Sequence, residues 1–331
     1  MTWQFTLTGL LIGVLVGLTG MGGGALLTPI LVLLFGFKPT YAVGTDILHG
    51  AVFKTFGAVR HRRLGTVHAR LTLWMFLGSG PLSLLGVAIA SRLEDAYGDG
   101  VQSAEGYAIG AALVLGAIGL VAKTFVKRGV QPSDAPFILQ RKDRVRAVLI
   151  GAVFGFIVGL TSVGSGTFFG LVMVMVYPLT ISKIVGTDIF HAAALLWVAG
   201  LGHLVQGNVN LHAMAWLLLG SVPGIWIASR FTVRLPQTAL RLGLAAVLAL
   251  SGIKLLDLPE SSYVIAIGLG LGLLAFVAWL ARSVRGVQSR GREPESANDS
   301  RARLARGDGD GFRGDAAPEA RAEPDLADAR R

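Results

Sequence analysis

Long apolar stretches fill most of this chain, and charged residues gather between them and toward the C-terminal end. Stretches of membrane-spanning length, about 20 residues each, lie at 67–91, 104–125, 183–202, 210–229, 237–256 and 262–281, with a shorter one at 41–58. Two further stretches, 3–35 and 145–177, are each about 33 residues long. This pattern predicts an all-α, polytopic transmembrane protein.

The pattern occurs twice, at a constant offset of 142 residues. GLTGMGGG at 17–24 is followed by VGTDILH at 43–49, and GLTSVGSG at 159–166 is followed by VGTDIFH at 185–191. A duplicated apolar unit interrupted by glycine is typical of secondary transporters. We predict two transmembrane repeats with glycine-broken first helices. The predicted segments are a first repeat at 1–125, a polar basic connector at 126–144, a second repeat at 145–257, an additional transmembrane helix at 258–282 and a disordered charged tail at 283–331.

Composition excludes several classes of protein. With 53% hydrophobic and 15% charged residues, and a mean hydropathy of +0.62, the chain does not read as two soluble domains. The net charge of +10 comes largely from residues that flank apolar stretches. Such charges report membrane orientation and not nucleic-acid binding. The absence of cysteine excludes disulfides and thiolate metal sites.

The two long stretches decide the predicted topology. A straight helix of that length would measure about 50 Å, whereas the apolar layer of a bilayer is about 30 Å thick. A chain that turns back at the glycines fits better, and each repeat then crosses an odd number of times. The basic clusters near Arg60, at 123–146, at 230–241 and after 281 would all face one side. We therefore predict inverted repeats in the cell membrane, with the N-terminus outside and the C-terminus in the cytoplasm.

Glycines have two predicted roles. Gly9 and Gly13, like Gly151 and Gly155, recur every four residues and let a neighbouring helix approach closely. The clusters that follow break the helix, and backbone N–H groups at such a break attract anions. The predicted substrate-binding residues are Thr19, Gly20, Gly22, Gly23, Gly24 and Thr45 in the first copy, and Thr161, Ser162, Gly164, Ser165, Gly166 and Thr187 in the second. The alternative is that these glycines provide only packing and a turn.

Each copy also carries an acid and a histidine three residues apart, which places them on one helix face. Asp46 with His49, and Asp188 with His191, are predicted to couple transport to protons or to contact the ligand. The alternative for the acids is a helix cap. Lys54, whose counterpart is Leu196, could supply a counter-charge to an anion or extend to the membrane surface.

These residues carry a resemblance to a known family. The two glycine-rich segments, the Val-Gly-Thr-Asp runs beginning at Val43 and Val185, and the later Gly80-Pro81 and Val222-Pro223 pairs resemble the TauE/SafE family of sulfite and organosulfur anion transporters. The resemblance covers about residues 5–257 and implies an exporter of small anions such as sulfite or sulfonates, working by alternating access. The implied partners are a small inorganic or organic anion and membrane lipid, and a homo-oligomer remains open.

An integral-membrane enzyme or a channel that uses the Asp/His pairs is the alternative function. No HExxH sequence and no nucleophile elbow occurs in the chain. We therefore assign no catalytic residue, no metal site and no cofactor. The two glycine segments, with the threonines beside them, remain the predicted substrate site.

Overall fold

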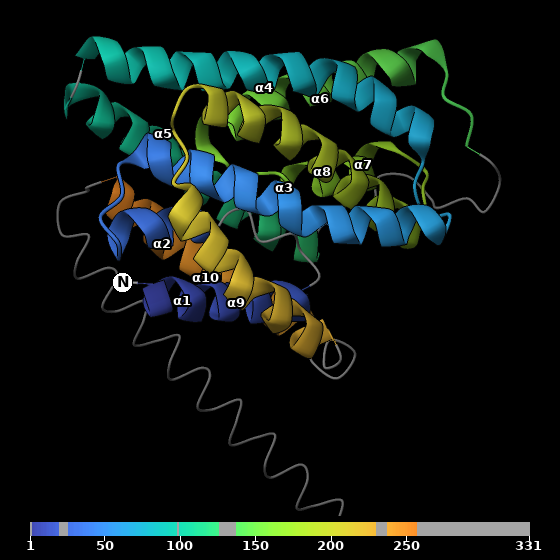
Figure 1. Cartoon of the computed structure of the whole chain (residues 1–331). Coiled ribbons are helices and arrows are strands. Elements are labelled where there is room, and N and C mark those ends of the chain that lie inside the picture. Colours follow the sequence, from blue (N-terminus) through green and yellow to red (C-terminus); the bar gives the residue numbers. More distant parts are fainter. Residues whose placement is uncertain (1, 20–25, 98, 126–136, 230–236, 257–331) are drawn as a thin grey trace, which may run out of the picture. The chain divides into compact units, whose positions relative to one another are not determined.

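The computed structural model describes residues 2–19, 26–97, 99–125, 137–229 and 237–256, all of which belong to one unit of the chain, residues 1–273 (Figure 1). The predicted additional helix at 258–282, the tail at 283–331 and most of the connector lie outside these residues. The described part is helical and contains no strand. The all-α fold predicted from the apolar stretches is confirmed.

Within the residues that the structure describes, each copy contributes five helices. The first copy forms α1 (Thr2–Thr19), α2 (Leu27–Leu33), α3 (Pro39–Arg63), α4 (Ala69–Tyr97) and α5 (Asp99–Phe125). The second forms α6 (Arg141–Thr161), α7 (Phe168–Val176), α8 (Ile181–Val205), α9 (Leu211–Ser229) and α10 (Gln237–Leu255). Moved by 142 residues, the bounds of α3 become those of α8. The sequence repeat is therefore a repeat of local structure.

In the described part of the chain, four helices have the length and apolar composition to cross a membrane: Ala69–Arg92, Ala104–Ala122, Arg141–Thr161 and Ile181–Val205. They match four of the predicted apolar stretches. The stretch at 145–177 divides into α6 and α7, and the turn between them contains Ser162 at φ 63° and Gly164 at φ 108°. Three points stay predictions: that glycine causes this division, that glycine breaks the first helix of copy one, and that the two repeats are inverted.

Helices of the two copies are exchanged in the packing. The first helix of each copy packs along the fourth helix of the other, so that α1 lies beside α9 and α6 beside α4 (Figure 1). The central helices α3 and α8 pack against each other, as do α5 and α10. The most extensive helix–helix contacts therefore join one copy to the other, and the helices of neither copy pack mainly against one another.

Glycine permits these close contacts. A Cβ atom at Gly9 or Gly13 would collide with the backbone of α9, and one at Gly151 or Gly155 would collide with the backbone of α4. The predicted close approach along this glycine face is confirmed for these positions. At the junction of α5 and α10, a Cβ on Gly110 would lie 2.9 Å from the carbonyl of Gly252. Because dispersion acts over short distances, helices in lipid gain most of their packing energy from such approach.

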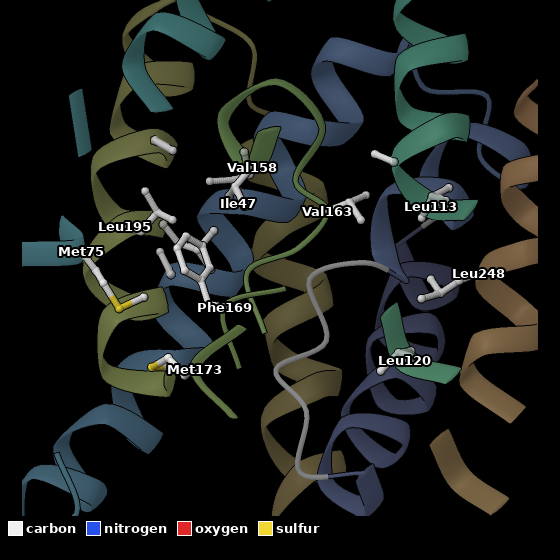
Figure 2. Packing of buried hydrophobic residues seen from close by; sticks show 14 of the residues in the cluster. Ile47, Met75, Leu113, Leu120, Val158, Val163, Phe169, Met173, Leu195 and Leu248 are labelled. Carbon is white, nitrogen blue, oxygen red and sulfur yellow. The ribbon is translucent and has the colours of Figure 1, made fainter. Parts of the chain in front are cut away.

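The larger apolar cluster spans both copies. Ile47 of α3, Leu195 of α8 and Phe169 of α7 are buried in it together with Val158 of α6, and Figure 2 shows their side chains around Phe169. A smaller cluster joins α1, α2, α3 and α9. Since each cluster draws on elements from the two copies, burial of apolar side chains holds α6 and α7 against the central helices, and α1 and α2 against α3 and α9.

We expect Gly155→Ala to destabilise the protein by about 1–3 kcal/mol, because its methyl group would overlap the backbone of Ser79. Gly243→Ala in α10 is the matched control, since nothing lies within 4 Å of its added methyl group. Thermal unfolding of the purified protein in detergent measures both. Equal stability of the two variants would show that α4 and α6 do not pack as closely as described.

Candidate functional site

Asp46 connects segments from both copies. It lies on α3, is 1% exposed, and its Oδ2 accepts hydrogen bonds from the Thr28 hydroxyl (2.6 Å), the Thr28 N–H (3.2 Å) and the Ser162 hydroxyl (2.9 Å). Thr28 is in the first turn of α2, and Ser162 ends α6. Asp46 is not the N-cap of its own helix, which begins at Pro39. It instead satisfies donors at the end of one helix and the beginning of another.

Lys54 lies two helical turns further along α3 and is also buried, with 4% of its surface exposed. Its ammonium donates hydrogen bonds to the carbonyl oxygen of Ser165 and to the Ser165 hydroxyl, the latter at 2.9 Å. The side chain therefore points into the protein and does not extend to the membrane surface. It is the single buried lysine or arginine among the side chains that the structure describes.

The second acid of the repeat, Asp188 on α8, is buried like Asp46, and both carboxyls are near enough to influence the Lys54 ammonium electrostatically. The two copies differ around their acids. The 142-residue counterparts of Thr28, Ser162, Ser165 and Lys54 are Gly170, Gly20, Gly23 and Leu196. At each of these positions one copy carries a hydroxyl or the ammonium and the other carries glycine or leucine. Thr28 and Lys54 belong to the first copy, and Ser162 and Ser165 belong to the second.

The histidines make a matching pair of contacts. A hydrogen bond of 2.9 Å joins His49 Nε2 to Ser221 Oγ, and another of 2.9 Å joins His191 Nε2 to Ser79 Oγ. The serines, like the histidines, are 142 residues apart. His49 also stacks on Phe53, and the His191 ring lies 4.4 Å from that of Phe169. Each histidine thus ties the central helix of its copy to the fourth helix of the other.

The predicted binding threonines and turn residues make local contacts. The hydroxyls of Thr45 and Thr187 accept the N–H groups of Asn210 (3.0 Å) and His68 (2.9 Å). The Thr161 hydroxyl donates to the Ile157 carbonyl (2.7 Å). The N–H of Gly166 donates to the Gly164 carbonyl at 2.7 Å. These hydroxyl groups and the Gly166 N–H are satisfied within the protein.

The first-copy residues of the predicted site cannot be placed in the same way. Gly20, Gly22, Gly23 and Gly24 lie outside the described residues, and Thr19 is described only as the last residue of α1. Their binding role, like that of the second-copy residues, stays a prediction. Among the described residues, no group of three His, Asp or Glu side chains is placed to hold a metal ion.

A small pocket opens beside the buried charges. It is lined by Ile12 and Val16 of α1 and by Asp46, His49, Gly50, Phe53 and Lys54 of α3. The space is close to that of one water molecule. The pocket therefore brings the acid, histidine and lysine predicted in the first copy to one wall, with apolar side chains of α1 opposite them.

Several contacts were not foreseen from the sequence. The repeat could have indicated Ser79 and Ser221, since they recur at the same offset as the histidines that they contact. The repeat could not have indicated Thr28, because its counterpart is Gly170 and its partner is 18 residues away. His61 forms a hydrogen bond with the hydroxyl of Thr66, in the loop that follows α3. Its counterpart His203 forms one with the carbonyl of Gly159 in α6 (3.0 Å).

We expect Ser79→Ala to lower stability by about 1–3 kcal/mol, because it leaves the buried Nε2 of His191 without its partner. Ser83→Ala is the control on the same helix, since the Ser83 hydroxyl donates only to the Gly80 carbonyl one turn earlier. Thermal unfolding in detergent compares the two. A loss in Ser83→Ala as large as that in Ser79→Ala would contradict a structural role for the histidine contact.

Comparison with known proteins finds a family and individual proteins to which this chain is similar. The profile of the family described as Sulfite exporter TauE/SafE matches residues 5–255. Probable membrane transporter protein YjnA of Bacillus subtilis (strain 168) is 39% identical over 256 residues, covering 77% of this chain and 100% of that protein. Probable membrane transporter protein YdhB of the same organism is 25% identical over 247 residues, covering 74% of this chain and 96% of that protein.

No solved structure matches the chain. The family and these relatives are described as membrane transporters and not as enzymes. The family match includes both copies of the repeat, the exchanged helices and the buried Asp46 and Lys54. This chain is a membrane transporter that belongs to the TauE/SafE sulfite exporter family.

Proposed function

We propose that this transporter carries a small anion, such as sulfite, a sulfonate or a related organosulfur compound, out of the cell through the cell membrane. The proposed site is centred on the pocket between α1 and α3, next to the turn between α6 and α7, and this pocket, now close to the size of one water molecule, must widen when the helices move to admit an anion. The family description supports sulfite export. The predicted orientation, with inverted repeats and a cytoplasmic C-terminus, belongs to this proposal.

The buried position of Lys54 is the observation that carries the proposal. A lysine removed from water in an apolar interior is costly, and packing alone would be better served by leucine, which stands at the corresponding position of α8. The ammonium lies against the carbonyl and hydroxyl of Ser165 and lines the pocket. Oxygen atoms of an anion are the same kind of acceptor, with the addition of a charge.

The partners of Lys54 make an exchange with an anion feasible. Ser165 offers neutral oxygens, which bind an ammonium less strongly than a charged oxygen does. An anion that enters the pocket can therefore take over one of these hydrogen bonds. The Ser165 contact then keeps the lysine satisfied when the site is empty, so that no buried charge is left without a partner.

The exchanged packing suggests how access could alternate. Helices α1 and α9 form one close pair, α4 and α6 form another, and α3 and α8 lie at the centre. Asp46 contacts α2 on one side and the end of α6 on the other. We infer that one pair tilts against the other around α3 and α8, as occurs in other two-repeat transporters.

We expect Lys54→Met to reduce sulfite counterflow in proteoliposomes by at least about tenfold, because a hydrogen bond to a charged group is worth roughly 1.5–3 kcal/mol. Methionine keeps most of the length of the side chain and removes the ammonium, with its charge and its hydrogen-bond donors. Leu196→Met, at the corresponding position of α8, is the control and should transport normally. Full sulfite flux in a correctly inserted Lys54→Met protein would remove this site from consideration.

A further inference from the structure

We propose that His203 and His61 alternately hold the ends of α6 and α1 during transport. In the state described here His203 holds α6, and in the opposite state His61 holds α1. The inference rests on the proposed function, because it assigns residues to the change of access that the proposal assumes. It adds two positioning residues that do not line the pocket between α1 and α3.

His203 holds the end of α6 by a buried hydrogen bond. Its side chain on α8 is fully buried, and its Nε2 donates to the carbonyl of Gly159 at 3.0 Å. In a continuous helix this carbonyl would accept the N–H of Val163, but that N–H donates to the Thr161 hydroxyl (3.3 Å). The histidine therefore supplies the donor that the end of the helix lacks.

The corresponding histidine of the first copy makes a different contact. The 142-residue counterparts of His203, Gly159 and Asn208 are His61, Gly17 and Thr66. His61 lies in the last turn of α3, is partly exposed, and its Nδ1 bonds the Thr66 hydroxyl at 2.9 Å in the loop that follows. Both copies therefore carry the histidine and the glycine near the helix end, and the described contact between them is in the second copy.

The loop after each histidine suits either contact. The N–H of Thr66 donates to the His61 carbonyl (3.2 Å) and that of Asn208 to the His203 carbonyl (2.9 Å), so both loops fold back on their histidine in the same way. The Asn208 side-chain amide donates to Ser91 (2.8 Å), and the Nδ1 of His203 has no hydrogen-bond partner among the described residues. When His203 releases α6, its Nδ1 can accept that amide, just as the Nδ1 of His61 pairs with Thr66.

The two histidines lie at opposite ends of the central helix pair. A Cβ on Gly44, near the start of α3, would lie 3.0 Å from the Cβ of His203 in the last turn of α8. One on Gly186, near the start of α8, would lie 2.5 Å from the Thr66 hydroxyl beyond the end of α3. Helices α3 and α8 therefore run in opposite directions, so His203 acts at one end of the pair and His61 at the other. Alternating access requires the two ends to differ in this way.

Release of α6 affects the pocket through the turn that follows this helix. Gly159 lies shortly before Ser162, whose hydroxyl bonds Asp46, and Ser165, which accepts from Lys54. Movement of the turn therefore frees Lys54 from its contact with Ser165. Each state has one histidine bonded to a helix end and one bonded to its own loop. The number of hydrogen bonds is conserved, so the two states can be close in free energy.

A single cysteine can report the exchange, since the natural chain has no cysteine. Val163 is fully buried in the turn after α6, so Val163→Cys in the full-length protein reacts with a maleimide only when this end is released. We expect His203→Leu to raise the labelling rate about three- to tenfold, because the described state loses its buried contact to α6. His61→Leu should lower the rate by a similar factor. The opposite state then loses its contact to α1, whereas water can replace the partly exposed loop contact.

Opposite shifts identify the exchange, because a general loss of packing would raise labelling in both variants. His203→Gln, whose amide can donate the same bond, should label at the natural rate, and His212→Leu, at an exposed position of α9, is the control. Shifts of the same direction in His203→Leu and His61→Leu, or no shift in either, would overturn the inference. Should His203→Leu fail to fold, the result for His61→Leu alone decides.

The labelling needs no substrate, so it separates this inference from the proposed function. Opposite shifts without any sulfite flux in proteoliposomes would contradict the proposed function and leave the exchange of histidine contacts standing. Sulfite flux together with shifts of the same direction would contradict the exchange and leave the proposed function standing.

Discussion

The structure depends on how the hydrogen-bond donors at helix ends find acceptors inside the protein, where water is absent. In a membrane, an unpaired backbone or hydroxyl group within the apolar layer costs several kcal/mol. Asp46 satisfies the start of α2 and the end of α6 with one carboxylate. The turn that begins at Ser162 then follows α3 for about two helical turns and brings Ser165 to Lys54. The position of the lysine, the pocket and the charge of the site all follow from this arrangement.

The two copies share their scaffold but not their chemistry. Contacts that build the fold occur in both copies, including the serine–histidine bonds and the glycine approaches between exchanged helices. The Thr28 and Ser162 hydroxyls that bond Asp46, and the ammonium of Lys54, each lack a counterpart at the corresponding position of the other copy. The repeat is therefore nearly symmetric in its packing and asymmetric in its buried polar groups.

The turn of the second glycine segment contains bonds of its own. The Gly166 N–H donates to the Gly164 carbonyl, and Gly164 has a positive φ that glycine adopts readily. The cation comes from α3, a straight helix of the other copy, and reaches the turn from the side. A rigid helix is a better support for a charged group than a turn, because its packing fixes the side chain.

The sequence by itself determined the helical class, the two copies and their offset, because apolar length and residue spacing are local properties that do not depend on folding. It also indicated the glycine faces, since small residues at every fourth position have few other uses in a membrane. Which helices meet was decided only in the tertiary structure. The exchange of α1 and α6 between copies brings Ser162 to Asp46 across 116 positions and Ser165 to Lys54 across 111. Such contacts depend on packing between distant segments, which no pattern along the chain specifies.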